Sequence, residues 1–547
     1  MAPRGRQEET KGSKGGAKQS VLVTGPLTPA VARVPSVQSL DSRALENWLW
    51  EASCRIRGAV DAPKFKDYIL PLIFVKRLSD VFDDEFARLK DQIGDEATAR
   101  ELVTQDRGLV RFFIPDLAKW DRIRSLSMRV GERVTDALRA VAKENPRLQG
   151  VIDVVDFNAT HAGERVIDDV RLQNLIEALS DPRYRLGLKD VEPDILGRAY
   201  EYLLRKFAEG QGQSAGEFFT PKEVGWLIAR LVNPQEGETV YDPACGSGGL
   251  LIKCELLLKE REGVVSKPLR LYGQESNHVT YAMSRMNMIV HDMEGEIAIG
   301  DTLRNPKFLD GGALRKFDAV VANPMWMQKD YDGSFYESDP FNRFWAGYPT
   351  TSTADWGWIQ HMLASLGERG RAAVVIDSGS VSRGSGGEGT SREKEIRAQF
   401  VRHDFIEAVI LLPDNLFYNT SGDGTILVLN RSKSDSRKGR LLLVNAAAEY
   451  SKGTPKNYLS DSSIMKVSGT FHAWTELPDF SRILTSDEVE RNDFNLHPAK
   501  YVGGGPTEEV TPIEEAVERL GRARRAEGAA EVELESELKA LRLRRMA

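Results

Sequence analysis

The sequence has few of the features that mark secreted, membrane-spanning or metal-binding proteins. Only three cysteines occur in 547 residues, and their number and spacing fit neither a disulfide framework nor a zinc site. No apolar run approaches the roughly 18 to 20 residues needed to span a bilayer. The first thirty residues also lack the apolar core of a signal peptide. We therefore expect a cytoplasmic protein with no membrane segment and no metal site.

The chain also lacks an excess of positive charge. It holds 74 Lys and Arg residues against 81 Asp and Glu residues, which gives a net charge of -7. A protein that grips nucleic acid unaided usually carries a basic surface that displaces counterions from the phosphates. We therefore expect that, if the chain binds nucleic acid, it does so through a small basic area of its surface or with the help of a partner protein.

The N-terminal part of the chain changes from a polar tail to a helical region. Residues 1–40 combine Gly, Ser, Pro and Lys with few apolar residues, and we expect a disordered tail there. Residues 41–210 carry apolar residues at helical spacing, for example Leu45, Trp48 and Leu49. This pattern predicts an all-α domain.

After Gly210 the pattern changes to short β-rich runs that alternate with helix-like segments. The runs are ETVYD, RLYGQES, FDAVVANP, RAAVVI, FIEAVILLP, GTILVLN and RLLLVNA. Such alternation predicts an α/β domain with a mostly parallel, doubly wound sheet over residues 211–475. Residues 476–547 are expected to hold an irregular segment and C-terminal helices, whose narrow apolar stripes suit packing against another subunit.

The strongest single motif is YDPACGSGGLL at residues 241–251, where a β run ends in an acid and a Gly-rich turn opens a helix. Glycines let backbone N–H groups approach a ligand closely, and a helix N-terminus favours a carboxylate or phosphate. The spacing lacks the GxGxxG of dinucleotide sites and the Lys of a phosphate-binding P-loop. The motif instead resembles motif I of the class I S-adenosylmethionine-dependent methyltransferases.

This resemblance implies cofactor contacts at three further places. Glu275 in LYGQESN would hold the ribose hydroxyls, because a carboxylate can accept two hydrogen bonds from a vicinal diol. Asp301 in IGDTL would contact the adenine amino group of the cofactor. GEFFTP at 216–221 resembles the motif that covers the methionine end. The expected cofactor residues are Glu217, Phe218, Phe219, Thr220, Pro221, Lys222, Asp242, Gly246, Ser247, Gly248, Gly249, Glu275 and Asp301.

The reaction is indicated by FDAVVANPMW at 317–326, which resembles the (D/N/S)PP(Y/F/W) motif of amino methyltransferases. The resemblance implies that the Asn323 side-chain oxygen and the Pro324 carbonyl bond both hydrogens of a target amine. Trp326 would stack on a base flipped out of the duplex. Transfer then needs mainly positioning and electrostatics. Met325 stands where the family usually has a second proline, and we expect it only to shape the turn.

The motif order matches the γ class of amino methyltransferases, and the resemblance to modification subunits of type I restriction-modification systems covers roughly residues 41–502. It extends through LENWLWEASCRIRGAVDAPKFKDYILPLIFVKRLSDVFDDE, ADWGWIQHML, LLPDNLFYNTSGDGTILVLN and NDFNLHPAKYV. The resemblance implies a class I methyltransferase fold, S-adenosylmethionine as cofactor, and methylation of adenine N6 in double-stranded DNA.

The same resemblance implies partners, because nothing in the chain looks like a target-recognition domain. A specificity subunit would choose the DNA site, with two modification subunits for each specificity subunit, and a restriction subunit could join the complex. Two alternatives stay open. One is a free-standing methyltransferase of RNA or protein glutamine, which the large helical N-terminal region disfavours. The other is an inert scaffold that acts as a sensor in phage defence, which Met325 keeps open and the intact Asn323 disfavours.

Overall fold

The computed structural model describes most of the chain between residues 42 and 503. The expected tail at 1–40 and nearly all of the expected C-terminal helices lie outside the described residues. Within the described part, no helix is long and apolar enough to cross a membrane. No group of three or more His, Cys, Asp and Glu side chains could hold a metal ion there. The described residues are 42–56, 65–161, 163–191, 193–209, 220–328, 333–350, 352–387, 391–418, 420, 422–454, 456–503, 521, 522 and 525.

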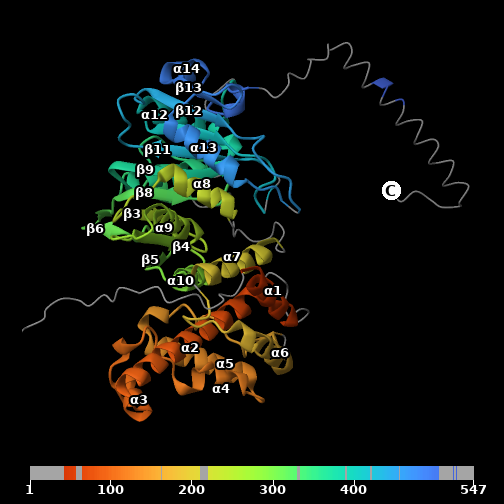
Figure 1. Cartoon of the computed structure of the whole chain (residues 1–547). Helices are drawn as coiled ribbons and strands as arrows, with labels where there is room; N and C mark the ends of the chain where they lie inside the picture. Colours follow the sequence, from red (N-terminus) through yellow and green to blue (C-terminus); the bar gives the residue numbers. More distant parts are fainter. Residues whose placement is uncertain are drawn as a thin grey trace, which may run out of the picture. The chain divides into compact units, whose positions relative to one another are not determined.

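The described residues of the N-terminal region form helices and one short strand pair, which confirms the helical prediction (Figure 1). The strand pair joins β1 (Thr160–His161) to β2 (Glu164–Arg165). The α-helices are α1 (Ser42–Ser53), α2 (Phe65–Ile93), α3 (Glu96–Gln105), α4 (Trp120–Arg124), α5 (Val130–Glu144), α6 (Asp169–Leu179) and α7 (Pro193–Glu209). Short 3-10 helices are η1 (Cys54–Ile56), η3 (Arg107–Leu109), η4 (Asp116–Ala118), η5 (Pro146–Leu148) and η6 (Pro182–Tyr184).

The apolar spacing that predicts these helices also builds their core. Leu45, Trp48 and Leu49 recur three and four residues apart on α1, and all three are buried. Each such side chain contributes roughly 1.5 to 3 kcal/mol by leaving water. The same cluster includes Met283 and Met286 of α10 (His278–Val290), a helix that follows the second strand of the large sheet. The helical region and the sheet region therefore share one core across α10.

The described residues of the sheet region form a nine-stranded sheet in the order β13-β12-β10-β11-β9-β8-β3-β4-β5. The strands are β3 (Thr239–Asp242), β4 (Arg270–Glu275), β5 (Gly295–Ile299), β8 (Phe317–Ala322), β9 (Leu366–Asp377), β10 (Ile406–Leu411), β11 (Gly424–Asn430), β12 (Arg440–Asn445) and β13 (Ser481–Thr485). Antiparallel neighbours are β9 with β11, β11 with β10, and β12 with β13, and the other neighbouring pairs are parallel. The prediction of a mostly parallel sheet is confirmed. A separate two-stranded sheet pairs β6 (Leu309–Asp310) with β7 (Ala313–Leu314).

Helices cover both faces of the large sheet, as a doubly wound fold requires (Figure 1). Along β3, Val240 packs into the core under α8, α9 and α13, while Tyr241 packs into the core under α11, α12 and α14. Neighbouring residues of a strand point to opposite faces, so one strand serves two cores. The helices are α8 (Lys222–Val232), α9 (Gly249–Glu262), α11 (Asp355–Ser365), α12 (Arg392–Arg402), α13 (Asp461–Ala473) and α14 (Ser486–Arg491). The remaining 3-10 helices are η8 (Gly333–Tyr336), η9 (Ser378–Val381) and η10 (Pro498–Lys500).

The end of the sheet differs from the sequence-based prediction. The chain after residue 475 was expected to be irregular, but β13 pairs there with β12, from Arg440 opposite Thr485 to Val444 opposite Ser481. The sheet therefore extends past the predicted boundary at 475. The five residues SRILT have no strict apolar alternation, and only Ser481 and Leu484 among them are buried.

The topology determines where a ligand can reach the backbone. From β3 the chain runs outward to β4 and β5, and then returns to β8 on the other side of β3. Such a reversal leaves a crevice outside the carboxyl ends of the two strands, which is where open α/β sheets bind ligands. The motif after β3 and the motif after β8 therefore meet at one edge.

Candidate active site

The glycine loop between β3 and α9 is held by backbone bonds. The N–H of Gly248 donates to the carbonyl of Cys245 at 2.8 Å, and the N–H of Cys245 donates to the carbonyl of Gln274 on β4 at 3.0 Å. Gly246 and Gly248 have φ values of 54° and 79°, a left-handed conformation that favours glycine. Helix α9 has no side-chain cap and no acid in its first turn. Its first N–H groups are therefore suited to an anionic group of a ligand.

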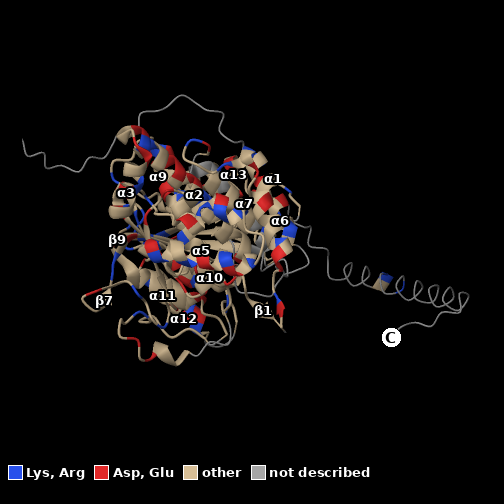
Figure 2. Ribbon diagram, turned by 90° about the horizontal axis from the view of Figure 1, so that it is seen from below, with Lys and Arg blue, Asp and Glu red and all other residues tan. Residues whose placement is uncertain are grey.

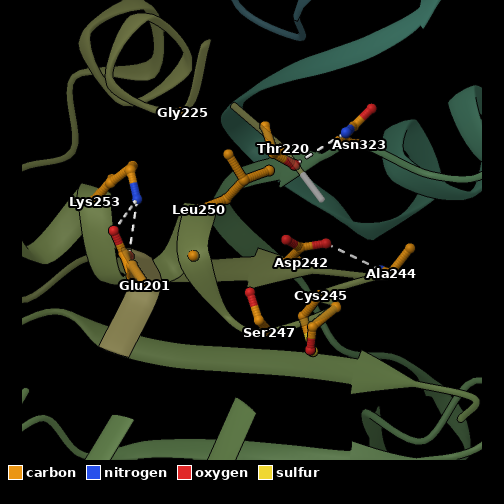
Figure 3. A pocket seen from close by; sticks show the side chains of 12 residues that line it. Glu201, Thr220, Gly225, Asp242, Ala244, Cys245, Ser247, Leu250, Lys253 and Asn323 are labelled. Carbon is orange, nitrogen blue, oxygen red and sulfur yellow. Dashed lines mark hydrogen bonds and ion pairs between the residues drawn. The ribbon is translucent and has the colours of Figure 1, made fainter. Parts of the chain in front are cut away.

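This loop lines a pocket together with side chains from widely separated segments (Figure 3). Six of the residues predicted from sequence meet there, namely Thr220, Asp242, Gly246, Ser247, Gly249 and Asn323. The predicted cofactor loop and the predicted base-binding Asn323 thus face one cavity. The remaining lining residues are Glu201, Gly225, Ala244, Cys245, Leu250 and Lys253.

Asp242, the last residue of β3, is buried in this pocket and accepts a hydrogen bond from the N–H of Ala244 at 3.0 Å. Burial and, to a smaller extent, the negative charge of Glu275 raise the pKa of Asp242 to about 8, against the lowering effect of the hydrogen bond from Ala244. A cationic group placed beside Asp242 would favour its ionised form.

Glu275 stabilises the glycine loop. It ends β4, and its carboxylate accepts hydrogen bonds from the N–H of Gly246 at 3.0 Å and from the N–H of Asn277 at 2.8 Å. Each carboxylate oxygen has a second lone pair. Oε1 also faces Ser276 Oγ at 3.4 Å, so a further donor of a ligand would be accepted mainly by Oε2, and Glu275 itself is not among the residues that line the pocket.

The other predicted cofactor residues lie outside the pocket lining. Asp301 follows β5 as predicted, but its half-exposed carboxylate accepts from the N–H groups of Leu303 and Arg304 at 3.0 and 3.2 Å and caps a turn. Pro221 is the N-cap of α8, and the exposed Lys222 begins that helix. Gly248 is the N-cap of α9 and is not among the lining residues. Glu217, Phe218 and Phe219 lie outside the described residues.

Two hydrogen bonds orient the Asn323 side chain at the end of β8. Its Nδ2 donates to Thr220 Oγ1 at 3.0 Å, and its Oδ1 accepts from Trp326 Nε1 at 3.0 Å. Asn323 is 7% exposed, and Pro324 is buried. The amide oxygen has two lone pairs, so one of them can still accept from a ligand.

Trp326 packs against the sheet at the same turn. Its ring meets Phe417 edge to face with ring centroids 4.6 Å apart. A Cβ on Gly424 would lie 2.8 Å from the Trp326 ring and 2.7 Å from the Phe417 ring, so only glycine fits at the start of β11. The ring is thus positioned by residues about one hundred positions downstream.

A buried carboxylate holds the next residue of the turn. Met327 has a φ of 48°, and its N–H donates to Asp355 Oδ1 at 3.0 Å. The other oxygen of Asp355 accepts from Ser380 Oγ at 2.6 Å and from Arg383 at 2.9 Å. Asp355 begins α11 and is fully buried. The sequence singled out ADWGWIQHML only by resemblance, and assigned Asp355 no role.

Sequence reasoning also missed an ion pair in the pocket. Lys253 Nζ on α9 lies 3.0 and 3.2 Å from the two carboxylate oxygens of Glu201 on α7. Their side chains are 7% and 16% exposed. Neither residue stands in a recognisable motif, since a lysine in the second turn of a helix is usually a solvated surface residue. The tertiary structure brings the two side chains, 52 residues apart in the chain, into contact.

The sequence matches two family models. The model of "N-6 DNA Methylase" matches residues 191–510 and the model of the "HsdM N-terminal domain" matches residues 45–179. The type I restriction enzyme MjaVIII methylase subunit of Methanocaldococcus jannaschii is 30% identical over 95% of this chain and 88% of its own length. The HindI methylase subunit of Haemophilus influenzae is 31% identical over 78% of this chain and 98% of its own length.

A solved structure has the same architecture. The type I restriction-modification system methyltransferase subunit of Streptococcus thermophilus superposes with a TM-score of 0.73 and 25% identity. The match covers 85% of this chain and all of that one. Sequence and fold therefore agree on the same kind of protein.

Proposed function

The chain belongs to the N-6 DNA methylase family and is an S-adenosylmethionine-dependent, adenine-specific DNA methyltransferase, and we propose that it is the modification subunit that methylates a site chosen by a separate specificity subunit. One observation carries the assignment of roles within the site. Asn323 lines the same pocket as the glycine loop, so an amine held by Asn323 lies beside whatever that loop holds. Methyl transfer requires the amine and the methyl donor to lie next to each other in this way.

The residues present fit S-adenosylmethionine. Gly246 and Gly248 let the backbone approach a ligand, and Asp242 is a buried carboxyl group that a cation would ionise. Glu275 stands beside the loop and can accept from the ribose diol. When bound, the cofactor supplies an electrophilic methyl group on a positively charged sulfur. The protein provides position and electrostatic stabilisation, and no covalent enzyme intermediate is needed.

The amine end of the site is formed by the turn after β8. An exocyclic amine on a purine is a poor nucleophile, because its lone pair is delocalised into the ring. The side-chain oxygen of Asn323 and the carbonyl of Pro324 would accept both amine hydrogens and favour a pyramidal nitrogen. Trp326 would support the base, which must leave the duplex because its N6 is otherwise unreachable.

A separate specificity subunit would supply the DNA recognition that this chain is not expected to provide by itself. The net charge is -7, and Figure 2 shows acidic and basic residues interspersed on the helices of that view, without a continuous basic face. The relatives carry the name methylase subunit, which fits a protein that works within a complex. We infer two modification subunits for each specificity subunit, a restriction subunit as a further partner, and a cytoplasmic location.

The test maps methylated bases in DNA from cells that express this chain with and without a neighbouring specificity gene. We expect N6-methyladenine at one bipartite sequence, and only when both genes are present. Asn323→Ala with the specificity gene is the matched control and should leave the DNA unmodified. Site-specific methylation by the chain alone would place recognition within it. A methyl group on cytosine, RNA or protein glutamine would contradict the proposed substrate.

A further inference from the structure

The ion pair between Lys253 and Glu201 forms one wall of the pocket. Figure 3 shows the two side chains pointing toward each other on the side of the cavity away from Asn323. They come from helices far apart in sequence, α9 and α7, and both line the cavity that the glycine loop lines. The proposed function uses neither residue.

Both groups of this pair are charged. Burial alone would raise the pKa of Glu201, but the charge of Lys253, together with other nearby cations, lowers that pKa below its ordinary value. A buried ion pair is costly compared with apolar side chains of the same shape, because both ions lose water. A ligand with complementary charges at this pocket wall would offset part of that cost.

The local packing is shaped around the lysine. A Cβ on Gly225 of α8 would lie 2.5 Å from Lys253 Cδ, so the glycine makes room for the lysine stem. A Cβ on Gly249 would lie 3.9 Å from Lys253 Nζ, which places the ammonium group beside the first residue of α9. A cation at a helix N-terminus is unfavourable by itself, whereas an anion between the two is favourable.

We propose that Lys253 and Glu201 bind the amino-acid end of S-adenosylmethionine, with the Lys253 ammonium holding the α-carboxylate and the Glu201 carboxylate holding the α-ammonium group. An amino acid zwitterion presents the opposite charges to those of the pair, so a ring of alternating charges forms on binding. The first N–H groups of α9 add donors for the same carboxylate. The inference rests on the proposed function, because it assigns the second end of the same cofactor.

The test compares two ligands that differ only in the amino-acid end. Calorimetry on the full chain would use S-adenosylhomocysteine, which carries that end, and 5′-methylthioadenosine, which keeps the adenosine and the sulfur but lacks it. We expect Lys253→Met and Glu201→Gln each to weaken S-adenosylhomocysteine about 10- to 100-fold, the range for a charge-assisted contact. Affinity for 5′-methylthioadenosine should stay within about twofold of the wild type.

Two further variants separate loss of the ligand contact from the general effect of disturbing a buried ion pair. The double variant Lys253→Met with Glu201→Met removes both charges without leaving a buried ion unpaired, and we expect the same selective loss. Lys433→Met is the matched control, because Lys433 is as buried and is paired with Asp404 at 2.5 Å after β11. It should change neither affinity.

The outcomes separate the two proposals. Wild-type affinity for S-adenosylhomocysteine in the double variant would overturn the inference, and so would an equal loss for both ligands, which would mean that the pair only shapes the pocket. If the unmodified chain binds neither ligand, the assignment of this pocket to the cofactor fails, and the inference fails with it.

Discussion

The glycine loop after β3 and the NPMW turn after β8 lie at the same edge of the sheet but are held in different ways. The loop is held by its own backbone, by the bond from Cys245 to Gln274 on β4, and by three side chains: Glu275 accepts from the N–H of Gly246, Asn287 donates to the carbonyl of Ser247, and Thr302 donates to the carbonyl of Pro243. The turn is held by side chains from elsewhere, since Thr220 lies 103 residues before Asn323 and Asp355 lies 28 residues after Met327. Both halves thus depend on the tertiary structure, but on different segments: the side chains that hold the loop lie 29 to 59 residues after it, whereas the turn also depends on Thr220, 103 residues before Asn323.

This difference predicts which measured quantity, cofactor affinity or turnover, changes when each half is mutated. A change in the loop acts where it is made and alters cofactor affinity. A change in a distant residue that supports the turn leaves the loop intact and alters the geometry in which the amine is held. Cofactor affinity and turnover should therefore respond to different sets of residues.

The largest expected effect belongs to Asn323→Ala. The substitution removes an acceptor that matters most as positive charge develops on the amine nitrogen during transfer. We expect single-turnover methylation of a cognate duplex by the assembled complex to fall by about a hundredfold or more. Cofactor affinity, measured by calorimetry, should barely change. A parallel loss of both quantities would show that the two halves are not separable.

A smaller effect is expected at Asp355, which is remote in sequence from the turn. Asp355→Ala removes the acceptor of the Met327 N–H and the partner of Ser380, so the turn loses its support. We expect turnover to fall by about tenfold, as when a positioned group becomes misplaced. Asp355→Asn keeps an oxygen acceptor of the same shape and should recover most of the rate.

Cofactor affinity is the control for the Asp355 pair. It should equal that of the wild type in both variants, because Asp355 binds Met327, Ser380 and Arg383 and does not line the pocket. A wild-type rate in Asp355→Ala would show that the turn keeps its shape without this carboxylate.

The same contrast explains what the sequence could predict. The glycine loop, the strand before it and the position of Glu275 were predictable because each is marked by a contiguous run of residues, and the large sheet was predicted from such runs as well. The support from Asp355, the ion pair of Lys253 with Glu201, and the edge strand β13 were not. Each of these exists only because distant segments pack together.

Asp301 shows what a sequence motif does not determine, which is the direction of a side chain. It lies two residues after the end of β5, in the turn that the sequence predicted, but in the structure its carboxylate accepts from the N–H groups of Leu303 and Arg304. A spacing pattern gives the place of a residue along the chain. The direction of its side chain depends on the donors that surround it, so its contact with the cofactor stays a prediction.

The smallest expected effect is a pH dependence that belongs only to the loop half. Burial raises the pKa of Asp242 to about 8, so in the ligand-free chain the carboxyl group is mostly protonated at pH 7. A cationic ligand favours the ionised form and lowers this pKa on binding. Affinity for S-adenosylmethionine should therefore rise about fivefold between pH 7 and pH 8 and level off above that, with release of a proton.

The same shift has a defined sign for stability. The pKa of Asp242 is higher in the folded chain than the ordinary value of 3.8, so the folded state holds an extra proton between about pH 4 and pH 8. Its contribution to the free energy of unfolding is complete below that window and is lost as the pH rises through it. Asp242→Asn should remove this slope in denaturant unfolding without ligand, and should remove the pH dependence of cofactor affinity. Asn323→Ala should retain both, because the turn after β8 does not carry this proton. A pH slope that survives in Asp242→Asn would assign it to another group, and would remove Asp242 from the cation-binding role that the loop half requires.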